Sequence, residues 1–393
     1  MSDTAGTPAA PPGEIDGFAA ASFAGVRDAF ARNLASGEEL GGSLCVIVDD
    51  EVVVDLWGGW SDPAGTVPWG ADTITNTWSN SKTVTALAAL QLVERGRLDL
   101  AAPVARYWPE FAAAGKAHIT VRQLLDHTAG VPAWEQPVTV SDILDQDAAA
   151  ARLAAQEPWF APGTSQSGYA LVCFGHLIGE VVRRIDGRPL GRFVAEELAD
   201  PLGADFWLGL PESEENRVSL VVPPPRVPRD PASRPEPGSI ATRAYSGPIL
   251  GARDSWTREW RAAGIGGAGG TGNARALARM NQMLAQGGLV EGTRLLSPAV
   301  VDAVFAHPTD STDLVLRLPL RFGLGWALPH PVSTPWLPGD HRIAFWGGWG
   351  GSLVICDLDR RMTFAYVMNR MAASVIGSDR SIDYVTRAYA ALG

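Results

Sequence analysis

A serine and a lysine three positions apart, Ser79 and Lys82, are the residues whose types and spacing most clearly suggest chemistry. Three positions span almost one helical turn, so the two side chains would project from one face of a helix. A serine hydroxyl becomes a nucleophile when a neighbouring base takes its proton, and a lysine can do so when burial keeps it partly neutral. A helix start adds positive potential and free N–H groups for an oxyanion. The pair therefore predicts acyl transfer through Ser79.

The use of lysine supports this interpretation. Of the 32 basic residues only Lys82 and Lys116 are lysines. An arginine at position 82 would stay protonated, whereas a lysine can act as a base. The alternative is that Ser79 only caps the helix and Lys82 is solvated. Ser81 is a rival nucleophile, but its side chain would not face Lys82.

The elements that must position this pair are predicted from hydrophobic periodicity. A helix over residues 77–98 would carry both side chains near its start, and apolar runs at 43–48 and 52–57 predict a β-hairpin. Further expected helices cover residues 18–36, 120–127, 139–155, 169–185, 188–199 and 380–391, another begins near Thr271 or Asn273, and strands cover 343–346, 352–356 and 362–368.

This order predicts an α/β (α+β) fold. Residues 18–75 and 265–393 would form an α/β domain built from both ends of the chain. Residues 76–264 would form an inserted, mainly helical domain that includes a Pro-rich surface loop near 211–240. Residues 1–17 are expected to be a flexible lead.

Composition limits the kinds of molecule that the chain can be expected to bind. With 46% hydrophobic and 19% charged residues the chain is typical of a globular protein, and its net charge of −11 disfavours nucleic acid and anionic membranes. The three cysteines lie in apolar runs without metal-ligand spacing, so we expect no metal. The GIGGAG run at 264–269 follows a polar, helix-like segment, which excludes a dinucleotide site.

The N-terminus lacks the features of a signal peptide, so we expect a cytoplasmic location. The sequence gives no indication of oligomeric state.

The segment around the pair, TWSNSKTVTALAALQLVERGRLDLAAPVARYWPEF, resembles the nucleophile helix of the serine β-lactamase and penicillin-binding-protein superfamily. It most resembles the class C-like branch that includes family VIII carboxylesterases. VRQLLDHTAGVPAW is similar to the family's LLTHTSG segment, and the PGT at 162–164 also fits. The resemblance covers roughly residues 20–390 and implies a β-lactamase-like fold, with an antiparallel sheet flanked by helices and an inserted helical domain.

The resemblance also implies roles for further residues. The counterpart of the family's Tyr-x-Asn motif is Tyr169, expected to transfer protons beside Lys82, although Leu171 stands where the family has asparagine. The alternatives are that Tyr169 is a core tyrosine or that Tyr245 takes this role. His127 is expected to be structural, within the DHTAG turn.

The family's Lys-Thr-Gly motif is missing, and Trp346, Gly347 and Gly348 stand at the matching place, which resembles the esterase branch. By the same resemblance, the N–H groups of Ser79 and Trp349 would form the oxyanion hole. We expect substrate contacts from Trp346, Gly347, Gly348, Tyr245 and Trp134. Loss of the cationic lysine favours neutral or hydrophobic acyl groups.

The sequence thus predicts a carboxylesterase that forms an acyl-enzyme on Ser79, uses no metal or cofactor and acts on a small-molecule ester. Three alternatives stay open. They are an acyltransferase that passes the acyl group to an alcohol or amine, a β-lactamase or D-Ala-D-Ala peptidase, and a non-catalytic binding module. No G-x-S-x-G elbow is present, which argues against an α/β-hydrolase.

Overall fold

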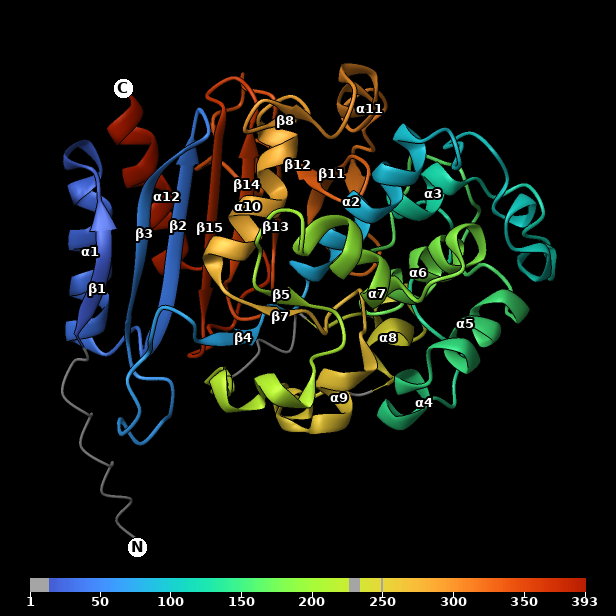
Figure 1. Cartoon of the computed structure of the whole chain (residues 1–393). Helices are drawn as coiled ribbons and strands as arrows, with labels where there is room; N and C mark the ends of the chain where they lie inside the picture. The colour runs from blue at the N-terminus through green and yellow to red at the C-terminus, as the bar shows by residue number, and fades with distance from the viewer. Residues whose placement is uncertain (1–13, 226–233, 249) are drawn as a thin grey trace, which may run out of the picture.

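A nine-stranded antiparallel sheet forms one side of the molecule (Figure 1). The computed structural model describes residues 14–225, 234–248 and 250–393. At the middle of the sheet, β2 from the N-terminal part pairs with β15 from the C-terminal part, so both ends of the chain build it. In spatial order the strands are β1 (Ile15–Ala19), β3 (Glu51–Gly59), β2 (Gly41–Val48), β15 (Met362–Met368), β14 (Leu353–Asp357), β13 (Ile343–Gly347), β12 (Ala327–Leu328), β11 (Pro319–Phe322) and β10 (Ser311–Thr312).

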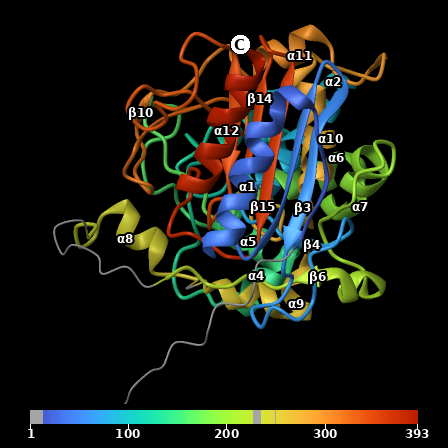
Figure 2. The same cartoon turned by 90° about the vertical axis from the view of Figure 1, so that its left-hand side faces the viewer.

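Helices cover both faces of this sheet. The helices α1 (Ala24–Ser36) and α12 (Asp379–Leu392) lie together on one face, where the rings of Phe30 and Tyr384 meet edge to face at 6.0 Å (Figures 1 and 2). On the other face, α10 (Ala274–Ala285) packs against β2, β14 and β15. The mixed fold with an antiparallel sheet flanked by helices is the fold class that the sequence predicted.

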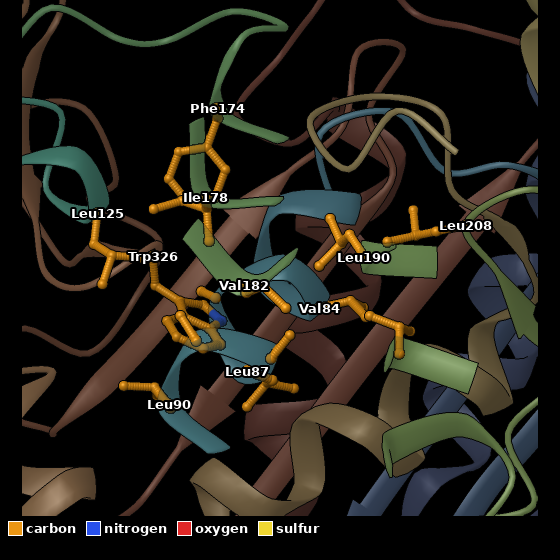
Figure 3. Packing of buried hydrophobic residues seen from close by; sticks show 14 of the residues in the cluster. Val84, Leu87, Leu90, Leu125, Phe174, Ile178, Val182, Leu190, Leu208 and Trp326 are labelled. Atoms are coloured by element: carbon orange, nitrogen blue, oxygen red, sulfur yellow. The ribbon is translucent and has the colours of Figure 1, made fainter. Parts of the chain in front are cut away.

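The helical region packs around α2 (Ser81–Glu94), which is buried on all sides from Ser81 to Leu92. A helix that is apolar all round can be stable only inside a core. Its residues Val84, Leu87 and Leu90 pack with residues of α6 (Phe174–Asp186) in one cluster (Figure 3). The other α-helices in the described residues are α3 (Val121–Leu125), α4 (Val140–Leu144), α5 (Gln146–Ala155), α7 (Leu190–Val194), α8 (Ile240–Tyr245), α9 (Arg258–Ala263) and α11 (Pro298–Ala303).

A second, four-stranded sheet of very short strands lies at the start of α2. One of its two central strands, β4 (Ile74–Asn76), leads directly into the nucleophile segment. Antiparallel to it runs β7 (Thr271–Gly272), so the glycine-rich run before α10 is brought to residues 77 and 78. The other strands are β5 (Phe206–Trp207) and β6 (Val218–Ser219), and a separate two-stranded sheet holds β8 (Leu289–Val290) and β9 (Thr293–Arg294).

The expectation of a flexible lead over residues 1–17 is wrong for its last residues. Strand β1 begins at Ile15 and pairs with β3 as the edge strand of the large sheet. The open edge of β3 supplies hydrogen-bond partners, and Gly17 makes the close approach possible, since a Cβ there would lie 2.0 Å from the Asp55 carbonyl oxygen. Residues 1–13 of the predicted lead lie outside the described residues.

Two further expectations change in detail. The helix expected over 18–36 starts as an α-helix at Ala24, after a 3-10 turn at Ala21–Phe23. The segment expected to be a long loop near 211–240 contains a 3-10 helix, Glu212–Arg217, and strand β6, while residues 226–233 of it lie outside the described residues. Within the described ranges, no helix has the length and apolarity needed to cross a membrane. The remaining short helical turns are Val104–Arg106, Pro109–Ala112, Ala195–Ala199 and Ala252–Trp256.

Candidate active site

Ser79 lies in a tight turn between β4 and α2. The preceding residue, Trp78, has φ +50°, a left-handed conformation that is rare for a bulky side chain. Because Trp78 is not in a right-handed helical conformation, α2 begins at Ser81 and not at residue 77 as expected, and Thr77 N–H donates to the Gly270 carbonyl instead (2.8 Å). This turn places Ser79 at the end of a buried helix with its side chain toward the first helical turn.

Lys82 has three hydrogen-bond partners. Its Nζ lies 3.1 Å from Ser79 Oγ, 2.7 Å from the Leu171 carbonyl oxygen and 2.7 Å from the Gly267 carbonyl oxygen. Burial lowers the pKa of Lys82 from 10.5 to about 7. Carbonyl oxygens only accept hydrogen bonds, so a neutral Lys82 donates both N–H groups to them. Its lone pair then faces Ser79 Oγ, which is the arrangement of a base beside a nucleophile.

Tyr169 adds a second hydroxyl group to the site, beside that of Ser79. Its side chain is buried, its ring centroid lies 4.7 Å from Lys82 Nζ, and its hydroxyl lies near enough to the Ser79 side chain for that side chain to affect the pKa of the phenol. Burial raises the pKa of Tyr169 far above its usual value, so the phenol keeps its proton. Trp346 Nε1–H donates to the Tyr169 oxygen at 3.0 Å. Because that oxygen accepts from Trp346, the phenolic proton is free to point toward Ser79.

The Trp346-Gly347-Gly348 run ends strand β13 beside the nucleophile turn. A Cβ on Gly347 would lie 2.1 Å from the Val375 carbonyl oxygen, and one on Gly348 would lie 2.5 Å from the Thr77 carbonyl oxygen. A side chain at Gly348 would push the strand end away from the nucleophile turn, and one at Gly347 would collide with the segment around Val375. Gly348 therefore lets the end of β13 pass against the turn that holds the nucleophile.

Two main-chain N–H groups near this turn have no protein acceptor. Among the described residues, neither Ser79 nor Trp349 donates a main-chain hydrogen bond. The ring of Trp349 packs against that of Trp78, with centroids 5.0 Å apart, so residue 349 lies beside the turn. Main-chain N–H groups without a protein acceptor are what a developing oxyanion requires.

Ser81 and Tyr245, the alternatives considered for the nucleophile and for the proton-transfer group, lie in different surroundings from Ser79 and Tyr169. Ser81 donates its hydroxyl to the Trp78 carbonyl (2.5 Å) and accepts from Gly270 N–H (2.8 Å), so its oxygen is held by the backbone, away from Lys82. Tyr245 ends α8 with 52% of its surface exposed, and its charge raises the pKa of the Tyr169 phenol. Tyr169 is the buried tyrosine whose ring lies beside Lys82.

Trp134 belongs to the core of the helical region. It is 1% exposed, its indole N–H donates to the Ala149 carbonyl at 2.9 Å, and its ring packs against His176 with centroids 4.9 Å apart. Trp134 therefore contacts residues of the core and does not lie among the residues around Ser79.

Sequence reasoning missed the two carbonyl groups around Lys82. A main-chain oxygen has no side-chain signature, so nothing at Leu171 indicated this contact. Gly267 lies in the run interpreted as a flexible turn, but a Cβ there would meet the Val172 carbonyl oxygen at 2.2 Å. The density of glycines in residues 264–270 was the one available signal that the backbone is closely packed here.

Comparison with known proteins agrees with this fold and arrangement. Residues 26–385 match the family model described as Beta-lactamase, and the chain belongs to that family. It is 34% identical over 387 residues to Esterase/beta-lactamase LipL of Mycobacterium tuberculosis (strain ATCC 25618 / H37Rv), an alignment that covers 93% of this chain and 86% of that protein.

Solved structures are similar over almost the whole chain. One described as a family VIII carboxylesterase superposes with a TM-score of 0.89 at 38% identity and covers 96% of this chain and 100% of its own. A penicillin-binding protein homologue from Caulobacter crescentus gives a TM-score of 0.87 at 38% identity, with the same coverage of both chains. The resemblance to this superfamily, stated from the motifs, is confirmed.

Proposed function

We propose that the protein is a carboxylesterase that works through an acyl-enzyme on Ser79. The observation that carries this proposal is the buried Lys82, whose Nζ lies 3.1 Å from Ser79 Oγ and whose pKa is lowered to about 7. A serine with such a neighbour can lose its proton at neutral pH. The names of the relatives, esterase and carboxylesterase, support ester hydrolysis in general.

In the first half of the reaction, the Ser79 proton passes to neutral Lys82, either directly or through the Tyr169 hydroxyl. Ser79 Oγ then forms a bond to the ester carbonyl carbon, and the N–H groups of Ser79 and Trp349 hold the resulting oxyanion. When the carbon–oxygen bond to the alcohol breaks, the alcohol takes a proton from the Lys82–Tyr169 pair. The product of this half is an acyl group esterified to Ser79.

In the second half, water replaces the alcohol. The same pair takes a proton from the water as its oxygen attacks the acyl carbonyl, and the bond to Ser79 Oγ breaks. Ser79 regains a proton and the carboxylic acid leaves. Lys82 is neutral again at the end of each half of the reaction. The carbonyl oxygens of Leu171 and Gly267 favour this cycle because they hold Nζ in one place throughout.

The acyl group we expect is neutral or hydrophobic. Trp346 supplies a neutral N–H at the position where the superfamily's Lys-Thr-Gly would supply a cation, and its N–H is already used by Tyr169. A carboxylate of a penicillin or peptide would find no charge from this residue. Because one relative is named both esterase and β-lactamase, lactam hydrolysis is the second candidate. The cytoplasmic location stays a prediction.

The test is steady-state hydrolysis of p-nitrophenyl esters of increasing acyl length and of a chromogenic cephalosporin. We expect turnover of the esters, with kcat/KM rising as pH passes through about 7, because the neutral form of Lys82 is the active one. Lys82→Arg keeps the charge but cannot deprotonate, so it should lack both turnover and the pH response. Ester turnover by Lys82→Arg at the wild-type rate would contradict the proposal, and preference for the cephalosporin would favour the second candidate.

A further inference from the structure

The main-chain N–H groups of residues 168–170, the segment that carries Tyr169, donate hydrogen bonds to His127 and to Asp313. Gly168 N–H donates to the His127 carbonyl oxygen (3.0 Å), and Ala170 N–H donates to His127 Nδ1 (3.2 Å). Between them, Tyr169 N–H donates to Asp313 Oδ2 (2.9 Å). His127 is therefore bound to both residues that flank Tyr169, once through its backbone and once through its imidazole.

The imidazole of His127 is fixed in place. The residue is 4% exposed, and its ring packs against those of Tyr169 (5.0 Å between centroids), Phe174 (5.3 Å) and Phe322 (4.6 Å). Its φ of +63° is left-handed, so the backbone turns sharply to bring both the carbonyl and the ring toward one segment. Three aromatic neighbours leave the ring little freedom to rotate away from Ala170.

The hydrogen bond to Ala170 also defines the chemical state of the ring. An N–H donor requires a lone pair on Nδ1, so the proton of a neutral His127 is on Nε2. Burial, and next the charge of Lys82, keep the pKa of His127 well below its usual value. A protonated ring would present an N–H to another N–H and lose this contact.

The same segment delivers both partners of the nucleophile. Tyr169 places its hydroxyl near Ser79, and two residues later the Leu171 carbonyl accepts from Lys82 Nζ at 2.7 Å. Displacement of this backbone would move the phenol and the carbonyl together. An error of about 1 Å in such groups can lower a rate by about 100-fold.

We propose that His127 is a positioning residue for the esterase reaction, whose neutral ring and carbonyl hold residues 168–170 so that Tyr169 and the Leu171 carbonyl stay aligned on Ser79 and Lys82. His127 does not touch the reacting atoms; it acts through the segment that does. The inference rests on the proposed function and names a residue that this function does not itself require.

The kinetic test compares three variants with the wild type. His127→Leu removes the Nδ1 acceptor at similar size, and we expect kcat to fall about 10- to 100-fold with KM within about twofold. His127→Asn keeps an acceptor oxygen and tolerates a left-handed φ, so it should recover most of the lost kcat. His176→Leu is the matched control, because His176 is also a buried histidine, and its ring is hydrogen-bonded to the Ile143 carbonyl and not to the segment that carries Tyr169.

Thermal unfolding separates folding from positioning. We expect His176→Leu to lower the unfolding midpoint without lowering kcat, and His127→Leu to lower kcat even well below its own midpoint. The proposal is overturned if folded His127→Leu keeps the wild-type kcat, or if His127→Asn is as slow as His127→Leu.

A second measurement needs neither variants nor activity. Nitrogen-15 NMR of the histidine rings at pH 7 should show His127 Nδ1 as an unprotonated acceptor and Nε2 as protonated. A protonated Nδ1 would overturn the inference whether or not the enzyme hydrolyses esters. If the wild type turned over no ester while Nδ1 proved to be an acceptor, the proposed function would fail and the hold on the Tyr169 segment would stand.

Discussion

Replacement of Lys82 by methionine should change the pH dependence of protein stability in a way that reports directly on the buried amine. The pKa of Lys82 is lowered from 10.5 to about 7 by burial. Below about pH 7 the folded protein therefore contains a buried charge, which destabilises it relative to the unfolded chain. That destabilisation disappears as pH rises from the folded pKa toward the unfolded one. The wild type should thus gain stability over Lys82→Met as pH rises.

The size of the effect follows from the two pKa values. Between pH 7 and pH 9 the unfolded chain keeps its Lys82 proton, while the folded protein goes from about half protonated to neutral. Integrating the difference in bound protons, at about 1.4 kcal/mol per proton per pH unit, gives about 2 kcal/mol. The carbonyls of Leu171 and Gly267 lose their donor in Lys82→Met at both pH values, so this loss cancels in the comparison.

The assay is urea unfolding of both proteins at pH 7 and at pH 9. We expect the free energy of unfolding of the wild type, minus that of Lys82→Met, to be about 2 kcal/mol larger at pH 9. Other titrating groups affect both proteins alike and drop out. The same difference at both pH values would mean that Lys82 titrates as it does in the unfolded chain, and the account of a neutral base beside Ser79 would be refuted.

Two further substitutions test the surroundings of the nucleophile. Trp346→Phe keeps a ring against Tyr169 but removes the N–H that donates to its hydroxyl, so kcat should fall about fivefold for the loss of about 1 kcal/mol, measured by steady-state kinetics; an unchanged kcat would show that this hydrogen bond does not orient the phenol. Gly348→Ala would place a Cβ 2.5 Å from the Thr77 carbonyl oxygen, so it should destabilise the fold by about 1–3 kcal/mol and lower kcat, whereas Gly339→Ala, with open space around its Cβ, should do neither. Equal unfolding midpoints and rates for the two alanine variants would contradict the close packing of β13 on the nucleophile turn.

Much of the fold could be predicted because its elements have clear periodicity. The hairpin of β2 and β3 follows two apolar runs, and α10 begins at Ala274 behind its Asn273 cap, as expected. Strand β1 was missed because five residues at an open sheet edge are ordered by their partner β3 and carry little signal of their own.

The candidate site, too, could be predicted only in part. The pairing of Ser79 with Lys82 could be predicted from side-chain type and spacing, and Tyr169 from the resemblance to the superfamily. The contacts with the Leu171 and Gly267 carbonyls could not, because they arise when segments far apart in sequence meet at Lys82. The strands β4 and β7, which bring the run that contains Gly267 to the nucleophile segment, contain only three and two residues, below the length at which a pattern is visible.

Trp134 illustrates a different limit. Its place in a motif-rich stretch suggested a substrate contact, but Trp134 and Trp346 are both 1% exposed, so it is the partners of each indole that separate them. Its indole N–H and ring are both satisfied within the helical core, by the Ala149 carbonyl and by His176. No pattern of spacing distinguishes such a residue from Trp346, whose N–H reaches the Tyr169 hydroxyl.

The central claim, that Ser79 carries the acyl group, is tested most directly by the intact mass of the protein after brief mixing with a p-nitrophenyl ester. The account predicts a transient increase by the mass of one acyl group in the wild type and in Ser81→Ala, and none in Ser79→Ala. Peptide mapping should locate the adduct on Ser79. An adduct of equal amount in Ser79→Ala, or ester turnover by that variant at the wild-type rate, would contradict the account.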